Sequence, residues 1–311
     1  MRNIFITLDY ELFFGSNSGT VEKSILYPTN KLLEVLDKYN VKASFFVDSG
    51  YLLKSGDKEV ISQIEKLSKE GHDIQLHIHP HWEDSYFQDS WKMDTTRYRL
   101  HQFENIDEIV GKYKKALTDI VENQVFVFRA GGWCIQPFDK IKDALKKENI
   151  WLDSTLFYGG RNKSETHFFD FRNSPKMDFW QFEEDPLIEK DGFFTEIPIS
   201  SYKLSPLFFW KLAFFKKFGG QKYKSFGDGS AIGGSKWDKI RMLTSFSWSP
   251  VSIDGYKSSF LQKAFEEFSE KNFVIIGHPK ALSKYSLKKL EEFIKKNISE
   301  NFTTYSKEFL K

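Results

Sequence analysis

The chain has 311 residues, of which 40% are hydrophobic and 17% aromatic, so it is long enough to bury a large core. The formal net charge of +2, from 45 basic and 43 acidic residues, excludes the strongly basic surface of a nucleic-acid-binding protein. The single cysteine, Cys134, excludes internal disulfides and a cysteine-rich metal site.

The N-terminus predicts neither export nor membrane insertion. Its apolar run Ile4–Leu8 is too short for the core of a signal peptide, and no small-residue cleavage site follows it. No stretch approaches the roughly 18 uninterrupted apolar residues of a membrane span. We therefore expect a cytoplasmic protein.

Short apolar runs alternate with helical patterns along most of the chain. Strands are predicted at Ile4–Leu8, Ala43–Val47, Asp73–His77, Val125–Phe128, Trp151–Asp153, Phe194–Ile197 and Phe273–Ile276. Helices are predicted at Thr29–Tyr39, Glu59–Lys69, Ile106–Glu122, Phe138–Lys147, Tyr256–Glu270 and the lysine-rich Tyr285–Lys296. This alternation favours parallel β/α units that nearly close a barrel.

Residues 158–250 depart from this rhythm. They are rich in Gly, Ser and aromatic residues, and we expect them to form a lid or an inserted substrate-binding segment within one catalytic domain that spans residues 1–311. Inside this segment, Phe208–Lys217 is aromatic with a basic end. That pattern is typical of a buried or dimer-facing helix, and also of a helix that rests on a membrane surface.

Chemically capable side chains end or follow the predicted strands. Asp9 follows the first strand, and the others are His77, Arg129, Asp153 and His278. In a parallel α/β barrel the carboxyl ends of the strands carry the functional loops. We therefore expect these side chains to meet in one site.

Four of the seven histidines lie between His72 and His81, and neutral imidazole is a common ligand of zinc-like metals. On a continuing strand, His77, His79 and His81 would share a face. If the chain turns after His77, then His77 and His81 converge and His79 points elsewhere. Because Pro80 disfavours a continued central strand, the sequence favours His77 and His81 as the metal ligands.

Asp9-Tyr10-Glu11 places two carboxylates two residues apart. On an extended backbone both point to the same side, which suits one carboxylate as a metal ligand and the other as a proton acceptor. An acidic turn at the end of a strand would give the same sequence. Which of the two carboxylates binds the metal stays open.

Five short motifs resemble, in their order along the chain, those of the NodB-homology polysaccharide deacetylases, carbohydrate esterase family 4. The motifs are Thr7–Glu11, His77–His81, Phe128–Trp133, Leu152–Ser154 and Ile276–Pro279. Val41–Val47 also resembles the family's second strand, and Gly71–Ile74 the lead-in to its histidine motif. The resemblance covers about residues 2–155 and 272–282.

The resemblance implies a distorted (β/α)7 barrel and a divalent metal ion, for which we expect Zn²⁺. It assigns His77 and His81 as metal ligands, and Glu11 is the natural third ligand. It also implies a hydrolase that removes an acyl group from the nitrogen of a sugar.

The same resemblance implies the catalytic roles. Asp9 would be the general base and Arg129 would orient it. His278 would be the general acid, and Asp153 would orient it. The glycines at the arginine motif would leave backbone N–H groups near Gly132 free to stabilise an oxyanion.

The sequence departs from the family pattern at three places. Tyr10 stands where the second of two adjacent aspartates is usual, Gly131 replaces a proline, and no tryptophan follows Asp153. These changes indicate a divergent branch with an Asp-x-Glu first motif.

The expected substrate is an N-acylated amino sugar, carrying acetyl or formyl. Because a cytoplasmic enzyme has no access to mature wall polysaccharide, we expect a nucleotide-linked, lipid-linked or free intermediate of surface-glycan synthesis. A lipid-linked substrate would suit contact of Phe208–Lys217 with the inner membrane surface. The alternatives are another metal-dependent amidohydrolase, acting on a small amide or imide, and a catalytically inactive carbohydrate-binding protein. A sugar site should expose aromatic side chains such as Trp82, Trp133 or Trp180.

Overall fold

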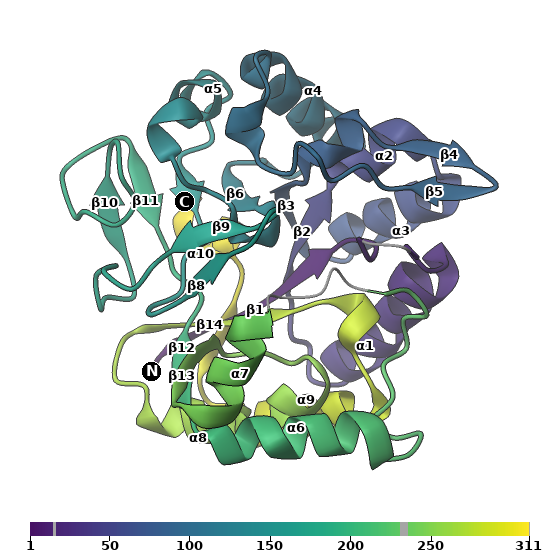
Figure 1. Cartoon of the computed structure of the whole chain (residues 1–311), viewed down its shortest axis with the longest axis vertical. Helices are drawn as coiled ribbons and strands as arrows, with labels where there is room; N and C mark the ends of the chain where they lie inside the picture. The colour runs from purple at the N-terminus through teal and green to yellow at the C-terminus, as the bar shows by residue number, and fades with distance from the viewer. Residues whose placement is uncertain (15–16, 231–235, 311) are drawn as a thin grey trace.

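The computed structural model of the protein describes residues 1–14, 17–230 and 236–310. A curled sheet forms its centre (Figure 1), and seven of its strands run parallel in the order β14, β1, β2, β3, β6, β7, β11. Their bounds are Asn3–Tyr10 (β1), Ser44–Asp48 (β2), Asp73–Ile78 (β3), Val127–Ala130 (β6), Leu152–Asp153 (β7), Phe194–Glu196 (β11) and Asn272–Gly277 (β14). Each strand predicted from the sequence is present at or close to its expected position.

The predicted distorted (β/α)7 barrel is confirmed. Irregular chain fills the gap between the two edges of the parallel sheet, β11 and β14. The N–H of Ser200 donates to the carbonyl of Val274 at 3.0 Å, beside β14. The N–H of Val251 donates to the carbonyl of Ser200 at 2.7 Å, and the N–H of Ile253 to that of Ile276 at 2.9 Å. These bonds satisfy backbone groups that an open edge would leave unpaired.

Helices surround the sheet (Figure 1). They are Tyr27–Lys38 (α1), Ser49–Ser55 (α2), Lys58–Lys69 (α3), Ile106–Thr118 (α4), Lys142–Lys147 (α5), Leu261–Glu267 (α8), Lys284–Lys296 (α9) and Tyr305–Phe309 (α10). Helix α3 shows why such segments are helical. It buries Val60, Ile64 and Leu67 along one face, and the carboxylate of Asp57 accepts hydrogen bonds from two N–H groups of its first turn.

Shorter elements follow or flank the barrel strands. A π-helical turn, Glu22–Leu26, precedes α1. Single 3₁₀ turns span Pro80–Glu83, Leu100–Gln102, Gly131–Trp133, Phe138–Lys140, Gly255–Phe260 and Pro279–Ala281. Shorter strands are Tyr86–Gln88 (β4), Ser90–Lys92 (β5), Trp180–Phe182 (β10), which pairs antiparallel with β11, and Asn301–Thr303 (β15), which pairs with the start of β1.

The segment predicted as an insertion, residues 158–250, is divided by the barrel strand β11. Before β11 lies the hairpin of β8 (Arg161–Lys163) and β9 (Phe168–Asp170). After it, the antiparallel pair β12 (Ser201–Leu204) and β13 (Ser247–Pro250) carries α6 (Pro206–Phe218) and α7 (Lys236–Thr244). Helix α6 lies along the outer edge of the molecule (Figure 1). Within the described residues, no helix is both long and apolar enough to cross a membrane.

Candidate active site

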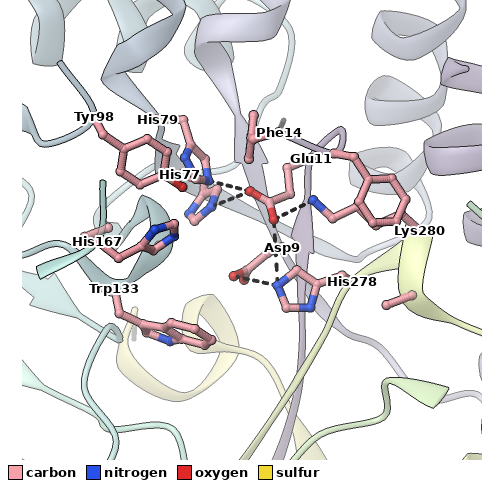
Figure 2. A pocket seen from close by; sticks show the side chains of 14 residues that line it. Asp9, Glu11, Phe14, His77, His79, Tyr98, Trp133, His167, His278 and Lys280 are labelled. Carbon is pink, nitrogen blue, oxygen red and sulfur yellow. Dashed lines mark hydrogen bonds and ion pairs between the residues drawn. The ribbon is translucent and has the colours of Figure 1, made fainter. Parts of the chain in front are cut away.

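A pocket of about 280 Å³ lies where β1, β3, β6 and β14 end. Asp9 and Glu11 come from the end of β1, His77 from β3, Gly132 from the turn after β6, and His278 from the residue after β14. Figure 2 shows His77 and His278 directed toward the Glu11 carboxylate, with Asp9 beside His278. The strand-end residues of the sequence therefore meet at one site, with the exception of Asp153.

Three buried side chains could hold a metal ion. The ligand atoms of Glu11, His77 and His79 all lie within 4.8 Å of one another. Oε2 of Glu11 is 3.2 Å from Nε2 of His77 and 2.5 Å from Nε2 of His79. Two imidazoles and one carboxylate are a typical donor set for Zn²⁺.

The hydrogen bonding of His77 fits a cation at this place. Its Nδ1 lies 2.9 Å from the carbonyl oxygen of Arg129, so Nδ1 carries the proton and donates it. In the neutral ring, the lone pair of Nε2 then faces the Glu11 carboxylate, and two acceptors at this separation require a cation or a proton between them. A backbone carbonyl that fixes the tautomer is the usual support of a metal-binding histidine.

Burial keeps His79 in the form that binds metals. It lowers the pKa of His79 to about 4, although the Glu11 carboxylate opposes this shift. Burial also favours neutral Glu11, but Lys280 and the two imidazoles outweigh it and hold the pKa of Glu11 well below its usual value. A neutral imidazole beside an ionised carboxylate is what metal coordination requires.

The structure brings His79, and not His81, beside His77 and Glu11. The extended conformation of β3 continues through His79, with φ −107° and ψ 93°, and the chain turns only at Pro80. His79 therefore shares a face with His77 by the two-residue period. His81 lies beyond the turn, fully buried, with its ring stacked on Tyr98 at 5.3 Å, and neither ring nitrogen has a hydrogen-bond partner among the described residues.

The glycine that replaces the family's proline makes room for His79. A Cβ atom at Gly131 would lie 2.5 Å from Nδ1 of His79 and 2.6 Å from the carbonyl of Ile78, which is far inside van der Waals contact. Gly132, the next residue, adopts a positive φ of +59° and lines the pocket. Glu11 and Gly131 thus both border the ring of His79.

Asp9 is held by Arg129, as the sequence predicted. A guanidinium nitrogen of Arg129 lies 2.7 Å from Oδ1 of Asp9 and 3.0 Å from the hydroxyl of Thr7. The guanidinium also donates to the carbonyl and the hydroxyl of Ser154, and it stacks on Phe46 at 3.9 Å. A buried guanidinium with this many partners fixes the Asp9 carboxylate in one orientation.

The carboxylate that contacts His278 is that of Asp254, and not that of Asp153 as the resemblance implied. Oδ2 of Asp254 lies 2.8 Å from Nδ1 of His278, and Oδ1 accepts the N–H of the same residue at 2.9 Å. Asp254 follows Ser252, which bridges to Ile276 at the end of β14, so the two chain segments run side by side. Burial by itself opposes the charged form of His278, but Asp254 and the pocket carboxylates raise its pKa above the ordinary value.

Asp153 lies on the other side of the barrel from His278 and Asp254. It is at the end of β7, and its carboxylate accepts hydrogen bonds from the N–H and the hydroxyl of Thr155. Its neighbour across the register is Glu196 of β11. Burial and the charge of Asp153 raise the pKa of Glu196 well above its usual value.

Lys280 and His167 also line the pocket, although the sequence did not predict them there. The ammonium of Lys280 donates to Oε1 of Glu11 at 2.8 Å and to the carbonyl of Leu12 at 2.6 Å. His167 comes from the turn between β8 and β9 and lies 4.6 Å from the ring of Tyr98, and burial lowers the pKa of His167 to about 4. Lys280 could have been found by its place two residues after His278, but nothing near His167 in the sequence connects it with the barrel.

Only one of the three tryptophans expected at a sugar site lines the pocket. Trp82 is fully buried and donates to Asp48 at 2.6 Å, and Trp180 is buried and donates to the carbonyl of Pro186 at 2.9 Å. Trp133 is partly exposed, and its ring lies opposite the Glu11 carboxylate (Figure 2). Of the three tryptophans, Trp133 is therefore the one that offers an aromatic face to the pocket, which Phe14 and Tyr98 also line.

Part of the chain is similar to a known protein family. Residues 24–134 match the family model described as polysaccharide deacetylase. No curated protein matches the sequence.

Several solved structures resemble the whole chain at low identity. A putative polysaccharide deacetylase from Mycobacterium smegmatis is 17% identical, with 96% of this chain and 85% of that chain covered and a TM-score of 0.49. A polysaccharide deacetylase from Bacillus cereus is 12% identical, with 98% and 92% covered and a TM-score of 0.45. The catalytic domain of a peptidoglycan N-acetylglucosamine deacetylase from Eubacterium rectale is 14% identical, with 97% and 86% covered and a TM-score of 0.40.

Because these likenesses are weak, the family assignment rests on the matched segment. That segment contains β2, β3 and β6, and with them His77, His79 and Arg129. This segment of the chain is thus similar to the polysaccharide deacetylase family, as the motifs predicted.

Proposed function

We propose that this protein is a metal-dependent hydrolase that removes an N-acyl group, acetyl or formyl, from an amino sugar. The observation that supports the proposal is the position of Asp9 and His278 beside the Glu11–His77–His79 donor set. Nε2 of His278 lies 3.6 Å from Oδ2 of Asp9, so a carboxylate and an imidazole border the same small space. Hydrolysis of an amide needs one group that accepts a proton from water and one that donates a proton to the leaving amine.

A divalent ion, which we propose to be Zn²⁺, would be held by Glu11, His77 and His79 and would supply Lewis-acid polarisation of the amide carbonyl. Asp9, oriented by Arg129, accepts the proton of the attacking water. Protonated His278, oriented by Asp254, donates its Nε2 proton to the amine nitrogen as the C–N bond breaks. Backbone N–H groups at Gly132 would stabilise the negative charge that develops on the carbonyl oxygen.

The substrate is proposed to be a free, nucleotide-linked or lipid-linked amino sugar of surface-glycan synthesis, deacylated in the cytoplasm. The pocket volume of about 280 Å³ suits a single sugar unit, and Trp133 offers the stacking surface. The direct test is to measure acetate and formate release from a panel of N-acyl amino sugars by zinc-loaded protein.

The same panel separates the alternatives. Release from simple amides or imide rings, without release from any sugar, would assign the protein to another class of amidohydrolase. Saturable binding of sugars without release would assign it to the inactive carbohydrate-binding proteins.

Replacing Asp254 with asparagine should lower kcat by about 10- to 100-fold, because the imidazolium of His278 loses its charged partner. Since Asp254 raises the pKa of His278, the variant should also lose its protonated general acid at a lower pH. The alkaline limb of the kcat–pH profile should therefore move to lower pH. The matched change Asp153→Asn should leave that limb in place, and a shift in this variant instead would restore Asp153 as the orienting residue.

The outer face of α6 and α7 supports the proposed contact with a membrane surface. Leu207, Trp210, Phe214 and Phe218 form an exposed stripe on α6, while Phe208 and Phe209 pack inward. Further exposed apolar side chains follow at Trp237, Ile240 and Phe246, and Lys211, Lys216 and Lys217 are exposed on α6. Exposed aromatic residues beside lysines are typical of helices that lie in the interface of an anionic bilayer.

A flotation assay with liposomes containing anionic lipid tests this contact. The double change Phe214→Asp/Phe218→Asp should reduce the bound fraction at least about tenfold at low salt, because two apolar side chains no longer insert. Phe87→Asp is a matched control, since Phe87 and Phe218 are both 64% exposed but Phe87 is on the β4–β5 hairpin. Equal binding of all three proteins, or no binding by the wild type, would contradict membrane contact.

A further inference from the structure

A second cavity, of about 330 Å³, lies beside the candidate active site. Its walls come from the β8–β9 hairpin, from α6 and α7, and from β13. Trp133 lines both this cavity and the catalytic pocket, so the two spaces are separated by the ring on which the sugar is proposed to stack. The proposed hydrolysis uses no other residue of this second cavity.

The charged lining of the second cavity is mostly cationic. Arg161, Arg241 and Lys257 face one acidic residue, Asp238. A guanidinium nitrogen of Arg241 lies 3.1 Å from Asp238, but its Nε is buried without a hydrogen-bond partner among the described residues. Among the residues that line the cavity, the cations Arg161 and Lys257 remain after this ion pair is counted, and Arg161 also lies near the carboxylate of Asp170 outside the lining.

Lys257 is the most enclosed of the three cations. Among the described residues its ammonium makes no hydrogen bond or ion pair, and the carboxylate that influences its charge is Asp254, one helical turn earlier. Burial lowers the pKa of Lys257, and the charge of Asp254 opposes this shift. A partly buried ammonium and a guanidinium with an unused N–H are costly to keep without an anion.

The donors fit a phosphate better than a smaller anion. Guanidinium groups recognise phosphate oxygens through paired N–H groups, and an ammonium adds a compact charge. Phe169, Phe209 and Trp248 complete the walls with apolar surface, which suits the organic group on the far side of the phosphate. Both observations point to an anionic group inside a larger, partly apolar molecule.

We propose that the second cavity binds a phosphate or diphosphate group attached to the amino sugar whose N-acyl group lies in the catalytic pocket. This inference rests on the proposed function, and it narrows the substrate class to phosphate-linked sugars. The phosphate could be supplied by a nucleotide or by a lipid carrier, and the chemistry recognised by Arg161, Arg241 and Lys257 is the same for both.

The test compares one sugar with and without the phosphate. The rate of deacylation is measured for N-acetylglucosamine 1-phosphate and for the methyl glycoside of N-acetylglucosamine, which carries no phosphate. Both substrates are tested with wild-type protein and with the variant Arg161→Gln/Arg241→Gln. The wild type should prefer the phosphate, and the ratio of the two kcat/KM values should fall by about 10- to 100-fold in the variant, because charge-assisted hydrogen bonds are lost. Arg97→Gln is the matched control, since Arg97 is an exposed arginine paired with Asp84 and lies outside the cavity.

A binding measurement keeps the two proposals distinguishable. Inorganic pyrophosphate should bind the wild type and the Arg97→Gln variant. Its affinity for the double variant should be lower by at least about tenfold. Deacylation without any preference for phosphate, together with equal pyrophosphate affinity in all three proteins, would overturn the cavity assignment and leave the hydrolase proposal intact. Pyrophosphate binding that depends on the two arginines, without turnover of any sugar, would support the cavity and overturn the hydrolase proposal.

The carrier is identified with two further substrates, a sugar linked through diphosphate to a nucleotide and one linked through diphosphate to a short polyprenol. A preference for either that disappears in the double variant supports the proposal and names the source of the phosphate. A preference that survives in the double variant contradicts it, because recognition would then lie outside the cationic cavity.

Discussion

Replacing His77 and His79 together with alanine is expected to abolish metal binding, whereas wild-type protein incubated with zinc should retain about one ion per chain. The reason is geometric, since Nε2 of each ring lies against Oε2 of Glu11 in one buried donor set. Loss of two of three protein ligands leaves a single carboxylate, which cannot hold the ion against dialysis. Elemental analysis after gel filtration measures the stoichiometry directly.

His81 provides the control for this experiment. Phenylalanine at this position preserves the ring that stacks on Tyr98, and it removes two nitrogens that have no partner among the described residues. His81→Phe should therefore keep its metal and its thermal stability. If His81→Phe loses the ion while His79→Ala keeps it, the ligand set is Glu11, His77 and His81, as the family resemblance implies.

The second large effect is expected from Asp9→Asn, which should lower kcat by about 10²- to 10⁴-fold, the contribution of a positioned general base. Asparagine keeps the shape of the side chain and can still accept a hydrogen bond from Arg129, but it cannot take a proton from water. Metal content should stay at the wild-type level, because Asp9 is not one of the three donors. Initial rates of acetate release and elemental analysis of the same preparation test both statements.

Asp9→Asn also weakens the contact with a fully buried guanidinium, so a loss of stability must be separated from a loss of chemistry. Asp73→Asn is a suitable comparison. Asp73 is another buried carboxylate, but it lies at the start of β3 and is bonded to Ser306 and Gln75, away from the pocket. It should lose stability with kcat preserved. Full activity in folded Asp9→Asn would refute the base assignment, and the carboxylate of Glu11 would then be the candidate base.

Metal removal and substrate recognition are independent in this scheme. The donor set and the cationic cavity share no residue, and among the described residues Trp133 is the one that lines both pockets. A protein without metal should therefore lose activity yet keep its dependence on Arg161 and Arg241 for pyrophosphate binding. This separation allows each half of the proposed site to be tested without the other.

The barrel could be predicted from the sequence because its strands are buried on both faces. Runs such as Ile4–Leu8 and Phe273–Ile276 are apolar at nearly every position, which distinguishes them from the helical patterns between them. Asp9, His77, Arg129 and His278 could be placed because each is adjacent to such a run, and parallel strands bring their carboxyl ends to the same edge. The Asp9–Arg129 pair followed from that placement and is present at 2.7 Å.

The partners across the barrel could not be derived in this way. Asp254 orients His278 because residues 251–253 fill the gap between the two ends of the sheet, a path that depends on how the insertion leaves and re-enters the barrel. His79, and not His81, lies beside Glu11 because the extended chain continues through His79. The room for the His79 ring is created by Gly131, which is more than fifty residues away in the sequence. His167 and Lys280 reach the pocket through turns whose geometry no local pattern specifies.

The sequence by itself determined the fold class, the alternation of strands and helices, and the kind of chemistry that the strand ends can perform. It could do so because burial and the strand period act on neighbouring residues, and both leave a pattern within a few positions. The tertiary structure alone decided which histidine joins Glu11, which carboxylate orients His278, and where a cationic cavity meets the pocket. These are contacts between residues far apart in the chain, fixed by the packing of whole elements against one another.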